Sequence, residues 1–193
     1  MAKEFELKYA AVPAQLEAIR AVLPETCTSI SMETTYYDTP SHDLSARKWT
    51  LRRRFENGVS VCTLKTPAGG PDRNEWEVES GNIESAIPEL CKLSNLSELA
   101  ALTNGGVIPV CGARFIRLAC RLEIEEAEAE LALDEGILFG GKRELPFAEV
   151  EVELKSGSEG AVCRFAEDLA RRFGLTPEEK SKFRRALDLA QGE

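Results

Sequence analysis

The sequence predicts an α+β fold in which an antiparallel β-sheet carries helices on one face. Segments of alternating charged and apolar residues recur along the chain, first at Glu4–Lys8 and again at Glu149–Lys155. Asn57-Gly58, a dipeptide typical of tight hairpins, lies between two further strand segments. Other stretches have the apolar spacing of amphipathic helices. We expect roughly eight strands, mostly joined as hairpins, in a single domain over residues 1–193.

Composition narrows the possible functions. The 193 residues are 43% hydrophobic, enough to bury a real core, and the net charge is -9. This balance argues against a general nucleic-acid or anionic-membrane surface, although it leaves room for a local basic site for an anion. Apolar runs are too short to span a bilayer. The N-terminus carries acids where a signal peptide needs basic and apolar regions, so we expect a cytoplasmic protein.

Cysteine and histidine content restricts the chemistry further. The chain has six cysteines and one histidine, His42. The cysteines form no C-x-x-C pair, so we expect reduced, largely buried thiols rather than a zinc or disulfide framework. One histidine excludes a multi-histidine metal site. Any metal would be held by carboxylates, which suit Mg²⁺, Mn²⁺ or Ca²⁺. The cysteines are Cys27, Cys62, Cys91, Cys111, Cys120 and Cys163.

The N-terminal half is expected to contain one helix and several strands after the first one. Helical spacing runs from Val12 to Leu23, and Pro24 follows its end. The β-forming segments that follow predict strands at 34–40, 49–55, 59–66 and 73–79, a connection at 44–48, and a Gly- and Pro-rich loop at 67–71.

The C-terminal half is expected to return to strands after a helical section. The patterns predict helices at 83–93 and 96–102, strands at 107–125, 128–134 and 149–155, and turns at Gly136 and at Gly140-Gly141. A helix should begin after a Ser158 cap and stop at Gly174. A last helix is expected to start near Pro177.

The polar faces of these strands are unusual. Arg52 and Arg54 share a face, as do Glu4, Glu6 and Lys8. A charged face on a lone strand is usually solvated, but here Arg, Lys and Glu recur with few Thr, Ser or Gln. If the sheet curls into a barrel, the charged face would line a cavity. Such charges must pair with each other or with a ligand.

A polyanion with divalent cations would satisfy a lining of both signs. Arginine and lysine would bind phosphate oxygens, and paired carboxylates would hold Mg²⁺ or Mn²⁺. Phosphoryl transfer needs little more than this positioning and charge neutralisation. A water molecule oriented by a carboxylate could then act as the nucleophile.

Eight sequence blocks, in order and over nearly the whole chain, resemble the CYTH superfamily, the triphosphate tunnel metalloenzymes. They are Glu4-x-Glu6-x-Lys8, Tyr36–Thr39, Leu51-Arg52-x-Arg54, Thr63–Lys65, Glu75-Trp76-Glu77, Leu131–Gly136, Glu149–Lys155 and Ser181-Lys182. The resemblance implies an eight-stranded antiparallel β-barrel, or tunnel, with helices packed outside and a C-terminal helix.

The resemblance also implies roles for individual residues. Phosphate binding is implied for Lys8, Arg52, Arg54, Lys65, Arg117 and Lys182. Metal binding is implied for Glu4, Glu6, Glu77, Asp134, Glu149, Glu151 and Glu153, with Glu130 as a further lining carboxylate. Catalytic roles are implied for Glu4, Glu6, Lys8 and Glu151. Arg114, Arg117 and Arg121 compete for one position, and the spacing to the later hairpin favours Arg117. Which two of Glu149, Glu151 and Glu153 contact metal stays open.

The function implied by the resemblance is hydrolysis of inorganic triphosphate to pyrophosphate and phosphate with Mg²⁺ or Mn²⁺. The alternatives are an adenylate cyclase of class IV type, a thiamine or nucleoside triphosphatase, and a non-catalytic polyphosphate-binding module. We expect Tyr36, Tyr37 and Trp76 in the core or at the rim rather than under a base. The partner is a small-molecule triphosphate, and a homodimer is possible.

The late blocks are most similar to bacterial inorganic triphosphatases, whose tunnel domain is often followed by a helical domain. The sequence here contains no such second domain, so we expect either a stand-alone member of the family or an excised domain.

Overall fold

The computed structural model describes residues 2–69 and 72–192, with backbone alone at residues 2–4 and 72. Its strands and helices alternate as the sequence patterns predict, with two additional short strands and one short helix. In chain order they are β1 Ala2–Glu4, β2 Glu6–Ala11, α1 Pro13–Arg20, β3 Thr28–Asp38, α2 Asp43–Ala46, β4 Thr50–Glu56, β5 Val59–Gly69, β6 Asp72–Glu79, α3 Ile83–Ser94, α4 Ser97–Thr103, β7 Ile108–Ile124, β8 Ala127–Gly140, β9 Arg143–Gly157, α5 Glu159–Phe173, β10 Thr176–Pro177 and α6 Lys182–Gln191.

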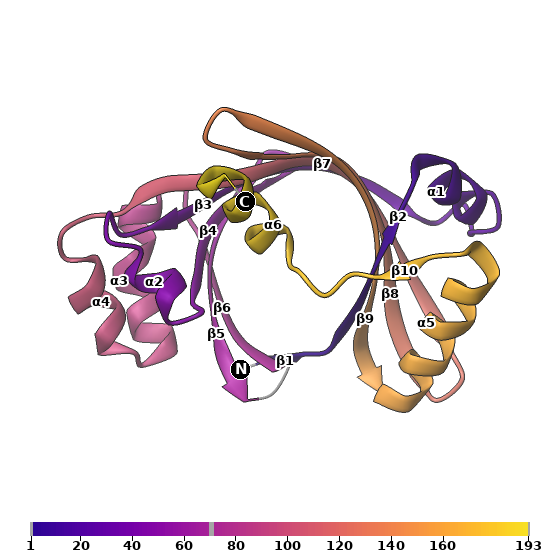
Figure 1. Ribbon diagram of the computed structural model, residues 1–193. Helices are drawn as coiled ribbons and strands as arrows, with labels where there is room; N and C mark the ends of the chain where they lie inside the picture. The colour runs from indigo at the N-terminus through magenta and orange to yellow at the C-terminus, as the bar shows by residue number, and fades with distance from the viewer. Residues whose placement is uncertain (1, 70–71, 193) are drawn as a thin grey trace.

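The strands of the described residues form one antiparallel sheet in the order β1-β6-β5-β4-β3-β7-β8-β9-β2-β10. The sheet curls into a ring, seen end-on in Figure 1. β1 and β2 are separated only by Phe5, yet β1 pairs with β6 and β2 pairs with β9. The N-terminal segment therefore spans the two edges of the curl.

The expected α+β architecture with an antiparallel sheet is confirmed, but the eight-stranded closed barrel is not. The other edge of β2 pairs with β10, at Ala10 and Tyr9, rather than with β6. Within the described residues, the hydrogen-bond ladder thus changes partner at Phe5 and does not run continuously around the ring, and the sheet has ten strands.

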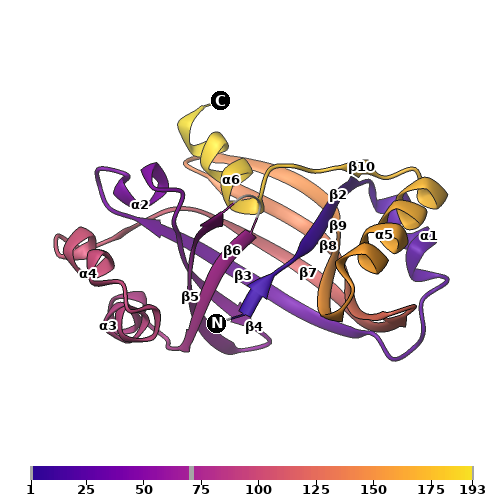
Figure 2. The ribbon, with the colours of Figure 1, turned by 90° about the horizontal axis from the view of Figure 1, so that it is seen from below.

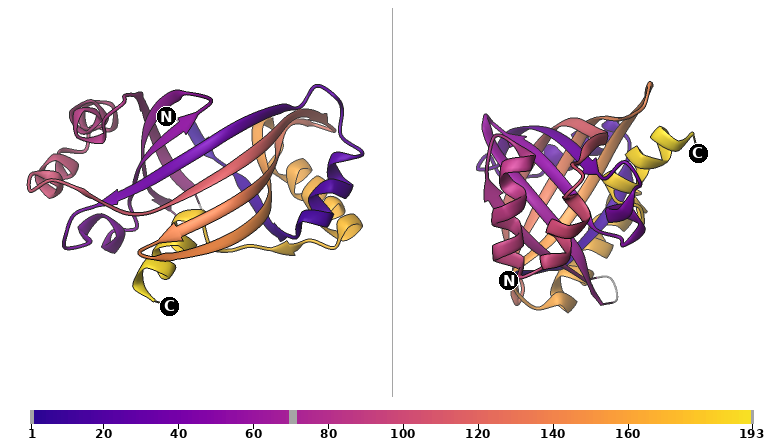
Figure 3. Two further views of the ribbon diagram at one scale, coloured as in Figure 1. Left: turned by 90° about the horizontal axis from the view of Figure 1, so that it is seen from above. Right: turned by 90° about the vertical axis from the view of Figure 1, so that its left-hand side faces the viewer.

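Helices cover the outside of the sheet in two groups, which Figure 3 shows at opposite sides. α1 and α5 pack over β8, β9 and β2, where Val150 and Val152 are fully buried. α2, α3 and α4 pack over β4, β5 and β6, where Leu51 and Leu64 are fully buried. Because these apolar side chains point outward to the helices, the alternate, charged side chains point into the curl.

The remaining helix, α6, belongs to neither group and lies at one end of the curl (Figure 2). Its Ala186 and Leu187 pack in a cluster with residues of β3, β7, β8 and β9. The prediction that this helix starts near Pro177 is wrong. Thr176–Pro177 instead pairs with β2, and the helix begins where the Ser181 side chain accepts a hydrogen bond from the Arg184 backbone N–H.

Local signals set the other helix ends. Ser158 caps α5 by accepting a hydrogen bond from the Ala161 N–H, and Gly174 ends it with a left-handed φ of 68°. Both limits are as predicted. α1 ends at Arg20, earlier than expected.

None of the helices within residues 2–69 and 72–192 combines the length and apolarity needed to cross a bilayer.

Two glycines of β8 mark close approaches of backbone. The predicted turn at Gly136 is wrong, because Gly136 lies inside β8, where a Cβ atom would stand 2.1 Å from the Arg114 carbonyl oxygen. Gly140 ends the strand before the expected turn, and a Cβ atom there would stand 2.3 Å from the Ala186 carbonyl oxygen of α6. The lack of a side chain at Gly140 therefore lets α6 rest directly on β8.

The expectation that all cysteines are reduced is wrong, because Cys27 and Cys120 form a disulfide across 93 residues of sequence. The pairing of β3 with β7 creates this neighbourhood, since Thr28 lies opposite Ala119. The spacing of the two cysteines in the sequence does not indicate the register in which β3 pairs with β7. Cys62 and Cys111 are free and buried, as expected.

The predicted loop at 67–71 is also only partly right, because β5 continues to Gly69, while residues 70–71 lie outside the described part of the chain.

Candidate functional site

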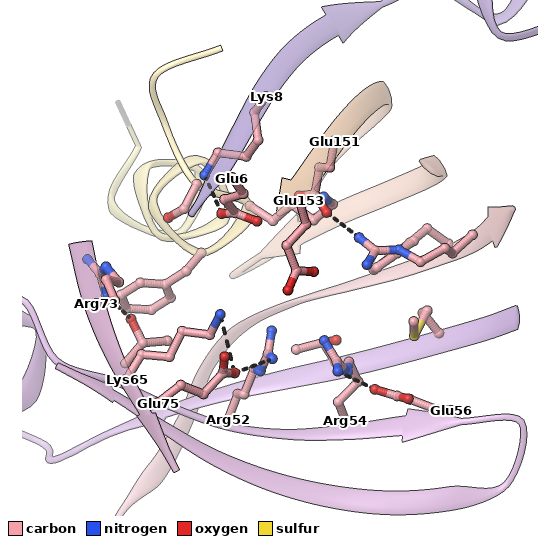
Figure 4. A pocket seen from close by; sticks show the side chains of 18 of the residues that line it. Glu6, Lys8, Arg52, Arg54, Glu56, Lys65, Arg73, Glu75, Glu151 and Glu153 are labelled. Carbon is pink, nitrogen blue, oxygen red and sulfur yellow. Dashed lines mark hydrogen bonds and ion pairs between the residues drawn. The ribbon is translucent and has the colours of Figure 1, made fainter. Parts of the chain in front are cut away.

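The curl of the sheet encloses a cavity of about 400 Å³. Acidic and basic side chains from seven strands and α6 converge on it, and Figure 4 labels ten of them. The charged lining residues are Glu6, Lys8, Arg52, Arg54, Glu56, Lys65, Arg73, Glu75, Glu77, Arg117, Glu130, Glu151, Glu153, Lys155 and Lys182. Strand alternation produces this lining, since the intervening residues face the outer helices.

One side of the cavity carries a row of opposed carboxylates. Glu153 of β9 lies opposite Glu6 of β2 on one edge and opposite Glu130 of β8 on the other. Lys155 contacts Glu153 at 2.8 Å and Glu130 at 3.7 Å, and Lys8 contacts Glu6 at 3.2 Å. Three neighbouring carboxylates repel one another, so this row favours cations. We call Glu6, Glu130 and Glu153 the carboxylate row.

The facing side of the cavity is rich in cations (Figure 4). Arg52 lies 3.4 Å from Glu75, and Lys65 lies 3.3 Å from the same carboxylate oxygen. Arg54, two residues along β4, pairs with Glu56. Burial lowers the pKa of Arg54, and the nearby positive charge of Arg52 lowers it further. An anion between these side chains would relieve that repulsion.

A second group of acids lies where α6 meets the sheet. Oxygen atoms of Asp134, Glu149 and Glu151 all lie within 4.8 Å of one another. We call these three residues the acidic trio. Lys182 of α6 places its ammonium group among them, 2.8 Å from Asp134 and from Glu151, and it also bonds to Glu149.

Two arginines complete the ionic cluster around the trio. The Arg117 guanidinium bonds both Asp134 and Glu151, while Arg185 bonds Glu149. Three cations therefore match three carboxylates. With α6 in this position, the acidic trio does not fit a divalent cation, because an ammonium group already occupies its centre.

Burial and charge set the protonation of this cluster. Burial raises the pKa of Glu149 to about 7, although Lys182 opposes this. Burial also acts to raise the pKa of Glu151, but Lys182 and Arg117 outweigh it and hold that pKa well below its usual range. Burial acts to lower the pKa of Lys182, but the carboxylates raise it above the ordinary value, so Lys182 stays protonated.

The structure gathers most of the predicted site residues at the cavity. Asp134 and Glu149 are fully buried beneath Lys182 rather than at the cavity surface. The Glu4 side chain lies outside the described residues. Arg114 and Arg121, the rivals of Arg117, pair with Glu144 and Glu128 and are 59% and 65% exposed. The predicted residues that line the cavity are Glu6, Lys8, Arg52, Arg54, Lys65, Glu77, Arg117, Glu130, Glu151, Glu153 and Lys182.

Sequence reasoning missed several neighbours of the site. Arg73 and Glu75 were not assigned to the site, although strand alternation places them in phase with Glu77, and all three line the cavity. Arg185 follows Lys182 by three residues on α6, a helical spacing that could have identified it. Tyr36 was expected in the core or at the rim, and it is buried at the cavity, against Phe183 with ring centroids 5.0 Å apart.

An antiparallel sheet curled around a cavity with acidic and cationic sides defines the class of this protein, an α+β domain with a charged internal cavity. The chain belongs to the CYTH family, since residues 2–187 match the CYTH domain.

The chain is 31% identical over 181 residues to an inorganic triphosphatase of Haemophilus influenzae, covering 88% of this chain and 50% of that protein. It thus spans about half the length of that relative. An 87-residue segment is 33% identical to an uncharacterised protein of Mycobacterium tuberculosis, covering 45% of this chain and 17% of that protein.

Solved structures show the same fold. The PH1819 protein of Pyrococcus horikoshii superimposes with a TM-score of 0.65 at 24% identity, covering 96% of this chain and 98% of that one. A putative adenylyl cyclase from Hippeastrum, described as having a dominant triphosphatase activity, superimposes with a TM-score of 0.64 at 19% identity, covering 100% and 97%.

Proposed function

We propose that this chain hydrolyses inorganic triphosphate to pyrophosphate and phosphate in its cavity, with Mg²⁺ or Mn²⁺ as the cofactor. The observation that carries the proposal is that Glu6 and Glu153 of the carboxylate row face Arg52, Arg54 and Lys65 across one cavity (Figure 4). The name of the Haemophilus influenzae relative, an inorganic triphosphatase, supports the same substrate.

The cationic side suits the phosphate chain. Arg52, Arg54 and Lys65, together with Arg73, can donate charge-assisted hydrogen bonds to phosphate oxygens. Arg117 of β7 and Lys182 of α6 also line the cavity and extend this set. These donors are held by neighbouring carboxylates before substrate arrives, so little reorganisation is needed when phosphate binds.

The carboxylate row is the best-fitting place for the metal. Glu6, Glu130 and Glu153 face the cavity, where Lys8 contacts Glu6 and Lys155 contacts the other two, whereas the acidic trio is filled by Lys182. Carboxylate oxygens are the ligands that Mg²⁺ and Mn²⁺ prefer. Such an ion would neutralise charge on the phosphate oxygens.

The reaction itself requires a water molecule beside the terminal phosphate. Its oxygen bonds to the terminal phosphorus, the bond from that phosphorus to the bridging oxygen breaks, and pyrophosphate leaves. Glu151, kept ionised by Lys182 and Arg117, lines the cavity and is suited to orient that water. Lys8 and Glu6 form the neighbouring pair on β2.

A second candidate is a triphosphate that carries an organic group. Ile30, Met32, Phe115 and Phe183 line the same cavity and offer an apolar surface to a base or a thiamine ring. Nucleoside or thiamine triphosphate hydrolysis, or cyclisation of ATP, would use that surface.

Phosphate release should be measured with inorganic triphosphate, ATP and thiamine triphosphate, each with Mg²⁺, Mn²⁺ or a chelator. We expect the highest kcat/KM with inorganic triphosphate. With a chelator we expect no phosphate release. Faster turnover of an organic triphosphate would favour the second candidate, and cyclic AMP formed without phosphate release would identify a cyclase. Tight triphosphate binding by calorimetry without hydrolysis would leave a binding module.

A further inference from the structure

Two cations on one face of α6 anchor this helix in the acidic trio. Lys182 and Arg185 are three residues apart, and both reach Glu149, which is fully buried. Lys182 bonds the Oε1 atom of Glu149, while Arg185 bonds its Oε2 atom and also lies 3.4 Å from Glu178. The two cations therefore share one carboxylate from different sides.

Every oxygen atom of the trio has a cationic partner. Arg117 bonds both oxygens of Asp134 and the Oε2 atom of Glu151. Lys182 bonds the Oε1 atoms of Glu149 and Glu151 and approaches Asp134. Arg185 supplies the remaining contact, to the Oε2 atom of Glu149. Removing Arg185 would leave three carboxylates, two of them fully buried, against two cations.

The three cations differ in their access to the cavity. Lys182 and Arg117 line it, whereas Arg185 is absent from the described residues of its lining. Arg185 instead stacks over Phe147, with its guanidinium carbon 5.5 Å from the ring centroid. Arg185 thus binds Glu149 without lining the cavity, so we do not expect it to contact a molecule held there.

We propose that Arg185 is a positioning residue for Lys182. By binding the far oxygen of Glu149, it leaves the Lys182 ammonium shared with Glu151 at the cavity wall and keeps divalent cations out of the acidic trio. Without Arg185, Glu149 would draw Lys182 away from the cavity, and the uncompensated charge of the trio would attract a divalent cation.

The direct test counts Mn²⁺ bound to substrate-free protein by electron paramagnetic resonance. Arg185→Gln should bind one more Mn²⁺ per chain than the wild type, and Arg185→Lys should return to the wild-type count. Arg184→Gln is the matched control, because Arg184 is the adjacent residue, carries the same charge and is 51% exposed beside Asp188. It should leave the count unchanged.

A charge-balanced double variant guards against loss of folding. Glu149→Gln combined with Arg185→Gln removes one acid and one base from the cluster, so it should show the wild-type Mn²⁺ count. An unchanged count in folded Arg185→Gln would overturn the proposal. If Arg185→Gln does not fold, an extra Mn²⁺ in the double variant would overturn it instead, because the extra site must depend on an unbalanced Glu149.

The kinetic part of the test rests on the proposed function. Arg185→Gln should raise KM for triphosphate about tenfold, through displacement of Lys182, and Arg185→Lys should recover most of that loss. A purely structural role would lower the melting temperature without adding a Mn²⁺ site. If no variant hydrolyses triphosphate, the proposed function fails, whereas the Mn²⁺ count still decides the role of Arg185.

Discussion

Arg117 and Asp134 lie directly opposite each other on β7 and β8 and share two hydrogen bonds, from Nε to Oδ1 at 2.8 Å and from Nη2 to Oδ2 at 2.7 Å. Asp134 is fully buried, and it forms ion pairs with Arg117 and Lys182. The pair therefore links β7, which carries the candidate phosphate ligand Arg117, to the ionic cluster in which Lys182 holds α6 against the sheet.

Replacing Arg117 by alanine should destabilise the fold, because it leaves the buried Asp134 with Lys182 as its remaining cation. We expect a loss of about 3–5 kcal/mol in the free energy of unfolding, measured by urea denaturation. Arg114→Ala is the control, since this arginine lies on the outer face of the same strand, 59% exposed, and should change stability by less than about 1 kcal/mol. Equal effects of the two changes would contradict the assigned roles.

Replacing Gly140 by alanine should displace α6, because the added methyl group would stand 2.3 Å from the Ala186 carbonyl oxygen. We expect faster amide hydrogen exchange in α6 and a lower melting temperature. Gly81→Ala is a suitable comparison, since no heavy atom lies within 4 Å of its added methyl group. Normal protection of α6 in Gly140→Ala would show that the helix does not depend on this contact.

Replacing Arg52 or Arg54 by alanine should weaken triphosphate binding, since both guanidinium groups face the cavity. KM should rise roughly tenfold or more for each, with a smaller change in kcat. Arg53 is the internal control, because it donates to the Gly81 carbonyl oxygen at 3.1 Å and does not face the cavity. If Arg53→Ala raised KM as much as its neighbours, β4 would not present its inner face to substrate.

Replacing Glu6 by glutamine should weaken metal binding at the carboxylate row. At limiting Mn²⁺ we expect turnover to fall about a hundredfold, with partial recovery as Mn²⁺ is raised. Glu135→Gln, an exposed carboxylate on the outer face of β8, should leave the metal dependence unchanged. Full turnover by Glu6→Gln at limiting Mn²⁺ would remove Glu6 from the metal site.

Thiol labelling should separate the free cysteines by burial. Burial raises the pKa of Cys62 to about 11 and that of Cys111 to about 12, so at pH 8 almost none of either thiol is ionised. Iodoacetamide should therefore label Cys91 and Cys163, which are partly exposed, before these two. Labelling at Cys27 and Cys120 should require prior reduction. Peptide mass spectrometry checks each position, and early labelling of Cys62 or Cys111 would contradict their burial.

The sequence predicted those features that depend on near neighbours in the chain. Alternation assigned Arg52 and Arg54 to one face of β4 and Arg53 to the other. Ser158 and Gly174 fixed the ends of α5, because caps act within one helical turn. Asn57-Gly58 marked the hairpin between β4 and β5, and both residues have the positive φ values that such a turn needs.

The sequence by itself thus determined which side chains share a strand face or a helix end, because periodicity and capping are local properties. Only the tertiary structure decided that Cys27 meets Cys120, that β8 runs straight through Gly136, and that Lys182 fills the acidic trio. Those contacts join residues far apart in the chain, so they depend on strand register and on where α6 packs. The sequence specifies which residues are charged, but the curl of the sheet decides which of them form ion pairs.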